Sequence, residues 1–122
     1  MSRRRDGGGI VNVSSMVAQV AYPSCIAYAM SKAAVNQFTR SLAAELGARG
    51  ITVNAVTPGA TITDFAPDLF NDPATVDLLA NMAALKRVGQ PEDVAKVIAM
   101  LAGPVAGWVT GQVIEASGGM HL

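Results

Sequence analysis

Residues 51–59 read Ile51-Thr52-Val53-Asn54-Ala55-Val56-Thr57-Pro58-Gly59. The first six are rich in β-branched and small apolar side chains, which is the composition typical of a strand. Thr57-Pro58-Gly59 is a strong turn signal, so the strand is predicted to end at Val56. These nine residues therefore predict a strand that runs directly into a turn.

A long helix is predicted before this strand, over residues 26–48. The segment is rich in alanine, leucine and other good helix formers, and two glycines mark its end. Its predicted buried side carries apolar residues at helical spacing, namely Val35, Phe38, Leu42 and Leu46. Before the helix, residues 10–13 read Ile-Val-Asn-Val and predict a short buried strand. Residues 14–25 connect that strand to the helix.

After Gly59 the pattern weakens, and prolines at positions 67 and 73 interrupt it. A short helix is predicted over residues 74–83. A second helix is predicted over residues 91–102, because Pro91 is followed by two acidic residues, which stabilise a helix N-terminus. Residues 112–116 predict the last strand.

The predicted order is β-α-β-(loop and helix)-α-β, which indicates an α/β fold with a parallel sheet and right-handed crossovers. The absence of a linker or an internal repeat predicts one domain over residues 1–122. Three parallel strands make a small sheet, so at least one edge strand is expected to need a cover.

Composition excludes several classes of function. Nine basic and nine acidic residues give a formal net charge of +0, which removes the electrostatic case for binding nucleic acid or an anionic membrane. No window reaches the roughly 18 apolar residues of a membrane span. A single cysteine, Cys25, excludes an internal disulfide, and a single histidine, His121, argues against a metal site. A reduced cytoplasmic setting is the expectation.

Tyr28 and Lys32 lie four residues apart, and Ser15 precedes Tyr28 by thirteen residues. On a helix, side chains at i and i+4 share one face. An ammonium beside a phenol favours the phenolate, and a serine hydroxyl from the neighbouring strand can hydrogen-bond the same substrate oxygen. The three residues therefore predict an acid/base site for interconverting a carbonyl and an alcohol. Taken singly, the Tyr–Lys pair also fits a helix-surface contact, and Ser15 also fits a turn or cap residue.

Several motifs occur together in the order of one known family. They are Val11-Asn12-Val13-Ser14-Ser15, Ala27-Tyr28-Ala29-Met30-Ser31-Lys32-Ala33-Ala34, Asn54-Ala55-Val56-Thr57-Pro58-Gly59, Arg87-Val88-Gly89-Gln90-Pro91-Glu92-Asp93, Thr110-Gly111-Gln112 and Gly118-Gly119. From Gly7 to Leu122 the chain resembles the short-chain dehydrogenase/reductase family, of the type that includes 3-oxoacyl-carrier-protein reductases. The resemblance implies a partial Rossmann-like three-layer fold, the C-terminal half of the family's domain.

The resemblance also implies the roles of individual residues. Ser15, rather than Ser14, would orient the substrate oxygen, Tyr28 would be the general acid or base, and Lys32 would assist Tyr28 and bind the nicotinamide ribose. The cofactor would be NAD or NADP, and the substrate a small carbonyl compound or secondary alcohol. The nicotinamide would be lined by Tyr28, Lys32, Pro58, Gly59, Thr61 and Thr63. Residues 64–88 would form a substrate lid, whose side chains Phe65, Leu69, Phe70, Leu78, Leu79 and Met82 suit an apolar substrate or simply pack the lid.

One part of the family pattern is missing from these residues. The Gly-rich turn that holds the cofactor pyrophosphate links a strand to a helix, whereas Gly7-Gly8-Gly9 precede a strand. Met1–Asp6 resembles the basic tail of the helix that precedes this strand in the family. The 122 residues alone are therefore expected to be inactive. The alternative to an oxidoreductase is an inactive truncated member that acts as an oligomerisation module or is a gene relic. In both cases a homo-oligomer is expected, through the helix starting near Ile26 and the C-terminal helix and strand.

Overall fold

The computed structural model describes residues 7–63 and 67–122 of the chain. The basic start Met1–Asp6 and the lid residue Phe65 lie outside the described residues, as does the side chain of Leu69. The main elements are β1 (Gly8–Val13), α1 (Ile26–Leu46), β2 (Ile51–Pro58), α2 (Pro73–Met82), α3 (Pro91–Ala102) and β3 (Val113–Ala116). Short 3₁₀ turns cover Met16–Ala18, Gly47–Arg49, Pro67–Phe70 and Pro104–Ala106. The three predicted strands and three predicted helices are all present, within a few residues of their predicted bounds.

The three strands form one parallel sheet in the order β1-β2-β3. β2 is the central strand, and its residues Val53, Asn54, Ala55, Val56 and Thr57 are completely buried. A strand buried on both faces explains the apolar, β-branched composition of residues 51–56. The α/β fold with a parallel sheet is therefore confirmed.

The predicted end of β2 at Val56 is wrong, because Thr57 and Pro58 continue the strand and pair with Glu115 and Ala116 of β3. Proline lacks the N–H that a ladder uses on one side. Pairing with β1 stops at Val13 opposite Val56, so Pro58 lies beyond the last β1 partner. The missing donor therefore breaks no bond of the sheet.

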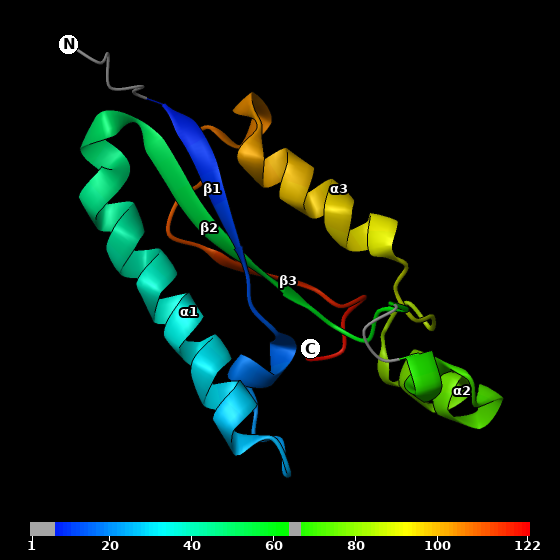
Figure 1. Cartoon of the computed structure of the whole chain (residues 1–122). Helices are drawn as coiled ribbons and strands as arrows, with labels where there is room; N and C mark the ends of the chain where they lie inside the picture. The colour runs from blue at the N-terminus through cyan, green and yellow to red at the C-terminus, as the bar shows by residue number, and fades with distance from the viewer. Residues whose placement is uncertain (1–6, 64–66) are drawn as a thin grey trace.

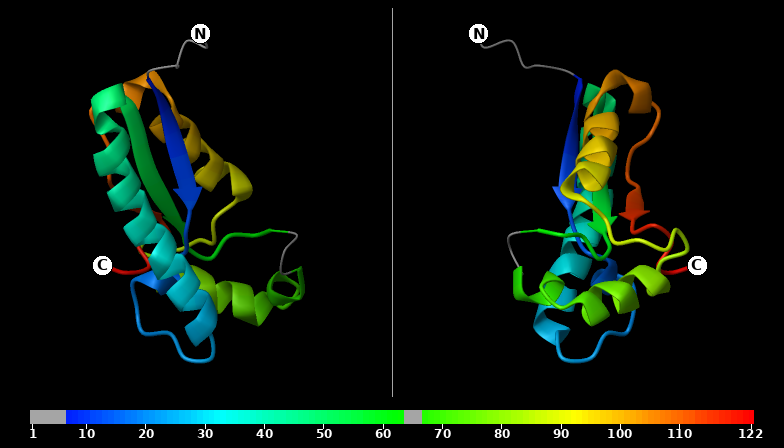
Figure 2. Two further views of the ribbon diagram at one scale, coloured as in Figure 1. Left: turned by 60° about the vertical axis from the view of Figure 1, so that its left-hand side comes forward. Right: turned by 90° about the vertical axis from the view of Figure 1, so that its right-hand side faces the viewer.

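Helices α1 and α3 cover opposite faces of the sheet (Figures 1 and 2). On β1, Asn12 Nδ2 donates to Thr39 Oγ1 of α1 at 3.0 Å, whereas Gly9 faces Ala102 of α3, which lies 3.1 Å from the position of a Cβ there. Residues three apart on a strand point to opposite faces, so this sheet is the middle layer of three. The connections β1-α1-β2 and β2-α3-β3 both move across the sheet in the same direction. Because their helices lie on opposite faces, one crossover is right-handed and the other is left-handed.

The expectation of right-handed crossovers is therefore wrong for one of the two connections. The right-handed rule applies to a strand that feeds a helix straight back onto its own sheet. The connection from β2 to β3 first leaves the sheet, and α2 lies beyond the end of the strands (Figure 1). This detour separates α3 from the end of β2 and removes the constraint.

The buried side of α1 is formed by Asn36, Thr39 and Ala43. Phe38 was predicted to be buried, but its side chain is 55% exposed. Successive helix residues are rotated by about 100°, so with Thr39 directed at the sheet Phe38 points well to one side of it. The small side chains at the contact allow α1 to lie close to β2, which a buried Phe38 would prevent.

Candidate active site

The carboxyl ends of parallel strands meet at one edge of a sheet, and the predicted site residues follow those ends. Ser15 is the second residue after β1, Gly59 comes directly after β2, and Ser117 comes directly after β3. Helix α1 begins at the same edge, which brings its first turns beside the end of β1 (Figure 2). The fold therefore gathers residues that are far apart in the sequence.

The two serines after β1 have different environments. Ser14 is buried, its Oγ donates to the carbonyl of Lys32 at 3.0 Å, and its N–H donates to Val56 O at 2.8 Å. Ser15 is only half-buried and caps a 3₁₀ turn, with its Oγ accepting from Val17 N at 3.4 Å. Ser14 ties β1 to α1 and β2, which leaves Ser15 the serine with the more accessible hydroxyl.

Tyr28 and Lys32 share one face of α1, as the spacing predicts. Lys32 Nζ lies 5.7 Å from the centroid of the Tyr28 ring and donates to the carbonyl of Val13 at 3.1 Å. Tyr28 is 48% exposed, and its hydroxyl has no protein partner among residues 7–63 and 67–122. The lysine is thereby anchored to the end of β1, while the phenol is left open to a ligand.

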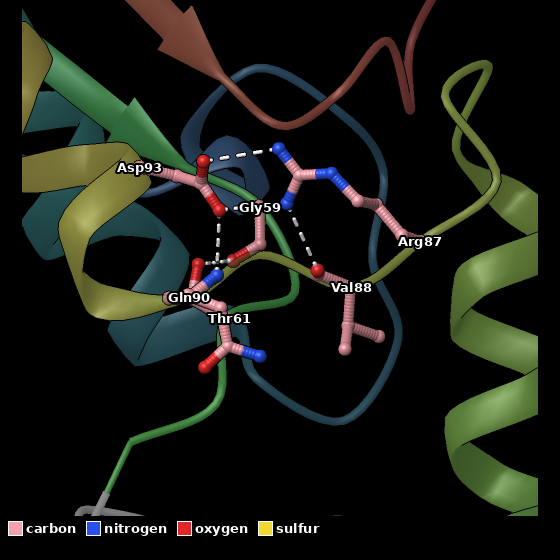
Figure 3. Close-up of polar contacts among 6 residues, drawn as sticks. All are labelled: Gly59, Thr61, Arg87, Val88, Gln90 and Asp93. Atoms are coloured by element: carbon pink, nitrogen blue, oxygen red, sulfur yellow. Dashed lines mark hydrogen bonds and ion pairs between the residues drawn. The ribbon is translucent and has the colours of Figure 1, made fainter.

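The loop after β2 is held by its own backbone. Gly59 N donates to Ala116 O at 3.0 Å, and Gly59 O accepts the Thr61 hydroxyl at 3.0 Å (Figure 3). The Thr61 hydroxyl is therefore turned back onto the loop. Thr63 is exposed and is the last described residue before position 67.

The structure adds an ion pair that the sequence reasoning missed. Arg87 approaches the Asp93 carboxylate with both terminal nitrogens, at 2.7 and 3.0 Å, and Gln90 N donates to Asp93 at 2.8 Å as part of a capping box of α3 (Figure 3). The hydrogen bonds from Arg87 and from Gln90 hold the pKa of Asp93 far below its ordinary value, and the same pair raises the pKa of Arg87. An acidic residue three positions after Gln90 was the available signal.

This pair predicts a pH dependence of stability. A carboxyl whose pKa is lower in the folded state stabilises the fold above the unfolded value of about 3.9, and the effect is lost as pH falls from there toward the folded pKa. We expect the difference in urea midpoint between the wild type and Asp93→Asn to be constant from neutral pH to about pH 4 and then to shrink. The matched control is Asp77→Asn, at an exposed site on α2. A difference that persists undiminished in strong acid would contradict this role of Asp93.

A cavity of about 220 Å³ lies between the loop after β2, the start of α3 and the end of β3. Its polar lining consists of Thr61, Arg87, Asp93, Glu115 and Ser117. Ser15, Tyr28 and Lys32 do not line it, so the cavity and the predicted acid/base residues lie at different places along this edge.

Over residues 7–63 and 67–122, histidine, cysteine and acidic side chains nowhere gather in a group of three or more that could hold a metal ion. In the same residues, none of the helices combines the length and the apolar character needed to cross a bilayer.

Comparison with known proteins gives a consistent result. A family model described as enoyl-(acyl carrier protein) reductase matches residues 1–121. The chain is 40% identical over 115 residues to the 3-oxoacyl-[acyl-carrier-protein] reductase FabG of Haemophilus influenzae, covering 94% of this chain and 47% of that protein. It is 44% identical over 116 residues to a 3alpha-hydroxysteroid dehydrogenase of Mediterraneibacter gnavus, covering 95% and 46%.

Among solved structures, the angucycline C-6 ketoreductase LanV with bound NADP superposes with a TM-score of 0.85 at 43% identity, covering 94% of this chain and 44% of LanV. The chain thus spans about half the length of the relatives it matches. The names of these relatives include a 3-oxoacyl-[acyl-carrier-protein] reductase, a 3alpha-hydroxysteroid dehydrogenase and an angucycline C-6 ketoreductase, so similarity alone selects no substrate.

Proposed function

Because the chain belongs to the short-chain dehydrogenase/reductase family, we propose that it forms the catalytic half of an oxidoreductase that transfers a hydride between NAD(P) and a carbonyl or secondary alcohol. The observation that carries the proposal is the arrangement at the end of β1. Lys32 Nζ is fixed on Val13 O beneath the Tyr28 ring, the Tyr28 hydroxyl is open, and Ser15 follows β1 two residues after Val13.

Each of the three residues has a distinct part in this chemistry. Tyr28 donates its phenolic proton to the substrate oxygen during reduction and accepts a proton from the alcohol during oxidation. Ser15 hydrogen-bonds the same oxygen and orients it toward the phenol. Lys32 places a positive charge where negative charge develops on the phenol oxygen, which stabilises the transition state electrostatically.

NAD or NADP supplies or accepts the hydride when it is bound. Pro58, Gly59, Thr61 and Thr63 follow the end of β2, at the same edge as Tyr28, and are proposed to line its nicotinamide. The described residues fit only this end of the cofactor. Gly7-Gly8-Gly9 lead into β1, and Gly7 N donates to Arg49 O at 2.9 Å, so these glycines do not form a phosphate-binding loop at a helix N-terminus. Bound NADP in LanV makes NADP a candidate beside NAD.

We propose that the chain also assembles with copies of itself through α1 and through the surface after α3. Ile26 and Met30 of α1 are 73% and 67% exposed, and Val105 and Trp108 are 88% and 100% exposed. Apolar side chains this exposed support an interface. The same exposed surfaces support the second candidate function, a non-catalytic oligomerisation module.

Cofactor binding discriminates between the two functions. We expect NADH or NADPH to bind the chain, or the polypeptide that contains it, with a Kd below about 100 µM, which corresponds to roughly 5.5 kcal/mol. Lys32→Met should weaken this binding, whereas Lys96→Met, at an exposed position of α3, should not. Calorimetric titration measures both. Absence of binding at millimolar cofactor would favour the oligomerisation module.

A further inference from the structure

The loop proposed to line the nicotinamide packs against the C-terminal turn, residues 117–120. At Gly59 a Cβ atom would lie 2.6 Å from Ser117 Cβ and 3.0 Å from Met120 Sδ. The next residue, Ala60, donates its N–H to Met120 Sδ at 3.4 Å. The Met120 thioether is the acceptor that the structure gives this amide, across sixty residues of sequence.

The C-terminal turn is itself held by side chains at the end of β3. Ser117 Oγ donates to Glu115 Oε2 and accepts from Met120 N at 3.1 Å. Glu115 Oε1 lies 2.6 Å from His121 Nδ1, and both side chains are largely covered. Met120 therefore projects from a turn that is fixed on both sides of it.

The same turn also binds the other end of the proposed lid. Ala84 N donates to Gly119 O at 3.1 Å, and Leu85 N donates to Gly118 O at 3.0 Å. Gly118 and Gly119 have positive φ, of 65° and 82° respectively, a backbone conformation that other residues adopt only at a cost. Gly89 closes the base of the lid, because its N–H donates to Ala60 O at 2.8 Å and its carbonyl accepts from Ile62 N at 2.9 Å.

From these contacts we propose that Met120 is a positioning residue for the loop Gly59–Thr61. A backbone N–H that is shielded from water needs an acceptor; Ala60 is half-buried, and the sulfur of Met120 accepts its N–H from outside the loop. The bond orients the peptide between Gly59 and Ala60, and with it the backbone face that the nicotinamide would meet. Only this last step rests on the proposed function, because the bond itself is a feature of the loop.

The test is the variant Met120→Leu, which keeps the volume and removes the acceptor. We expect hydrogen exchange of the Ala60 amide, followed by NMR, to become about fivefold faster, the factor that corresponds to losing one weak hydrogen bond. Met120→Gln, which restores an acceptor on an unbranched chain, should slow exchange again. The control is Met100→Leu, on the exposed surface of α3, which should leave the exchange of Ala60 unchanged. Equal Ala60 exchange rates in the wild type and Met120→Leu would overturn the proposal.

A second measurement separates this proposal from the proposed function. In a catalytically active polypeptide that contains these residues, Met120→Leu should raise KM for the cofactor several-fold and leave kcat nearly unchanged. The reason is that the loop contributes to cofactor binding rather than to proton transfer. Faster Ala60 exchange with an unchanged KM would support the positioning role of Met120 and contradict the assignment of this loop to the nicotinamide.

Discussion

Replacing Tyr28 by phenylalanine is expected to lower kcat for carbonyl reduction by a factor of about 10²–10⁴, the usual contribution of a general acid. The substitution removes one oxygen atom from a side chain that is 48% exposed. The hydroxyl has no protein partner among the described residues, so its loss leaves no buried group unpaired and should not change the stability of the fold. A large loss of turnover without a loss of stability would therefore report the chemistry alone.

The chain contains one other tyrosine, which provides the matched control. Tyr22 is 52% exposed on the connection before α1, and Tyr22→Phe should retain full activity. The assay follows NADPH oxidation with a panel of ketones that includes a 3-oxoacyl thioester and an oxosteroid. If Tyr28→Phe turned over as fast as Tyr22→Phe, the acid/base assignment would be wrong.

Much of the fold follows from local sequence. Residues 51–56 and 91–102 carry their own strand and helix signals; α3 forms over the predicted residues, and β2 begins at Ile51 as predicted but runs on to Pro58. Phe38 shows the limit of this reasoning, because α1 is apolar on more than one side and periodicity alone does not select the side that meets the sheet. The hand of the crossover that carries α3 is likewise set by how the helices pack on the two faces, and no local pattern records it.

In the candidate site, too, some contacts could be predicted from local sequence and others could not. Tyr28 and Lys32 could be paired from the sequence because four residues of helix fix their relative position. The cap formed by Asp93 could also have been predicted, since this acidic residue stands three positions after Gln90, where a capping box needs it. The bond from Ala60 to Met120 spans sixty residues. It exists only because β2 and β3 end side by side, so it becomes visible only in the folded chain.

The second large effect is expected at Gly59. The residue directly after β3 lies close to it, because an added Cβ at Gly59 would lie 2.6 Å from Ser117 Cβ and 2.8 Å from Ser117 Cα. Ser117 cannot retreat freely, because its neighbour Ala116 accepts the N–H of Gly59 and its own hydroxyl holds Met120 N. Gly59→Ala should therefore behave as overpacking, with a loss of about 1–3 kcal/mol in the free energy of unfolding.

At roughly 4 °C per kcal/mol for a domain of this size, the melting temperature of Gly59→Ala should fall by about 4–12 °C. Gly47→Ala is the control, because Gly47 has helical φ and ψ of −57° and −40° and open space around its Cβ position. That substitution should raise stability by about 0.4–1 kcal/mol, since alanine restricts the unfolded chain. Thermal melts of both variants by circular dichroism measure the contrast. If both variants melted at the same temperature, the contact between Gly59 and Ser117 would accommodate a Cβ without loss of stability. The loop after β2 would then not be held rigidly against the end of β3.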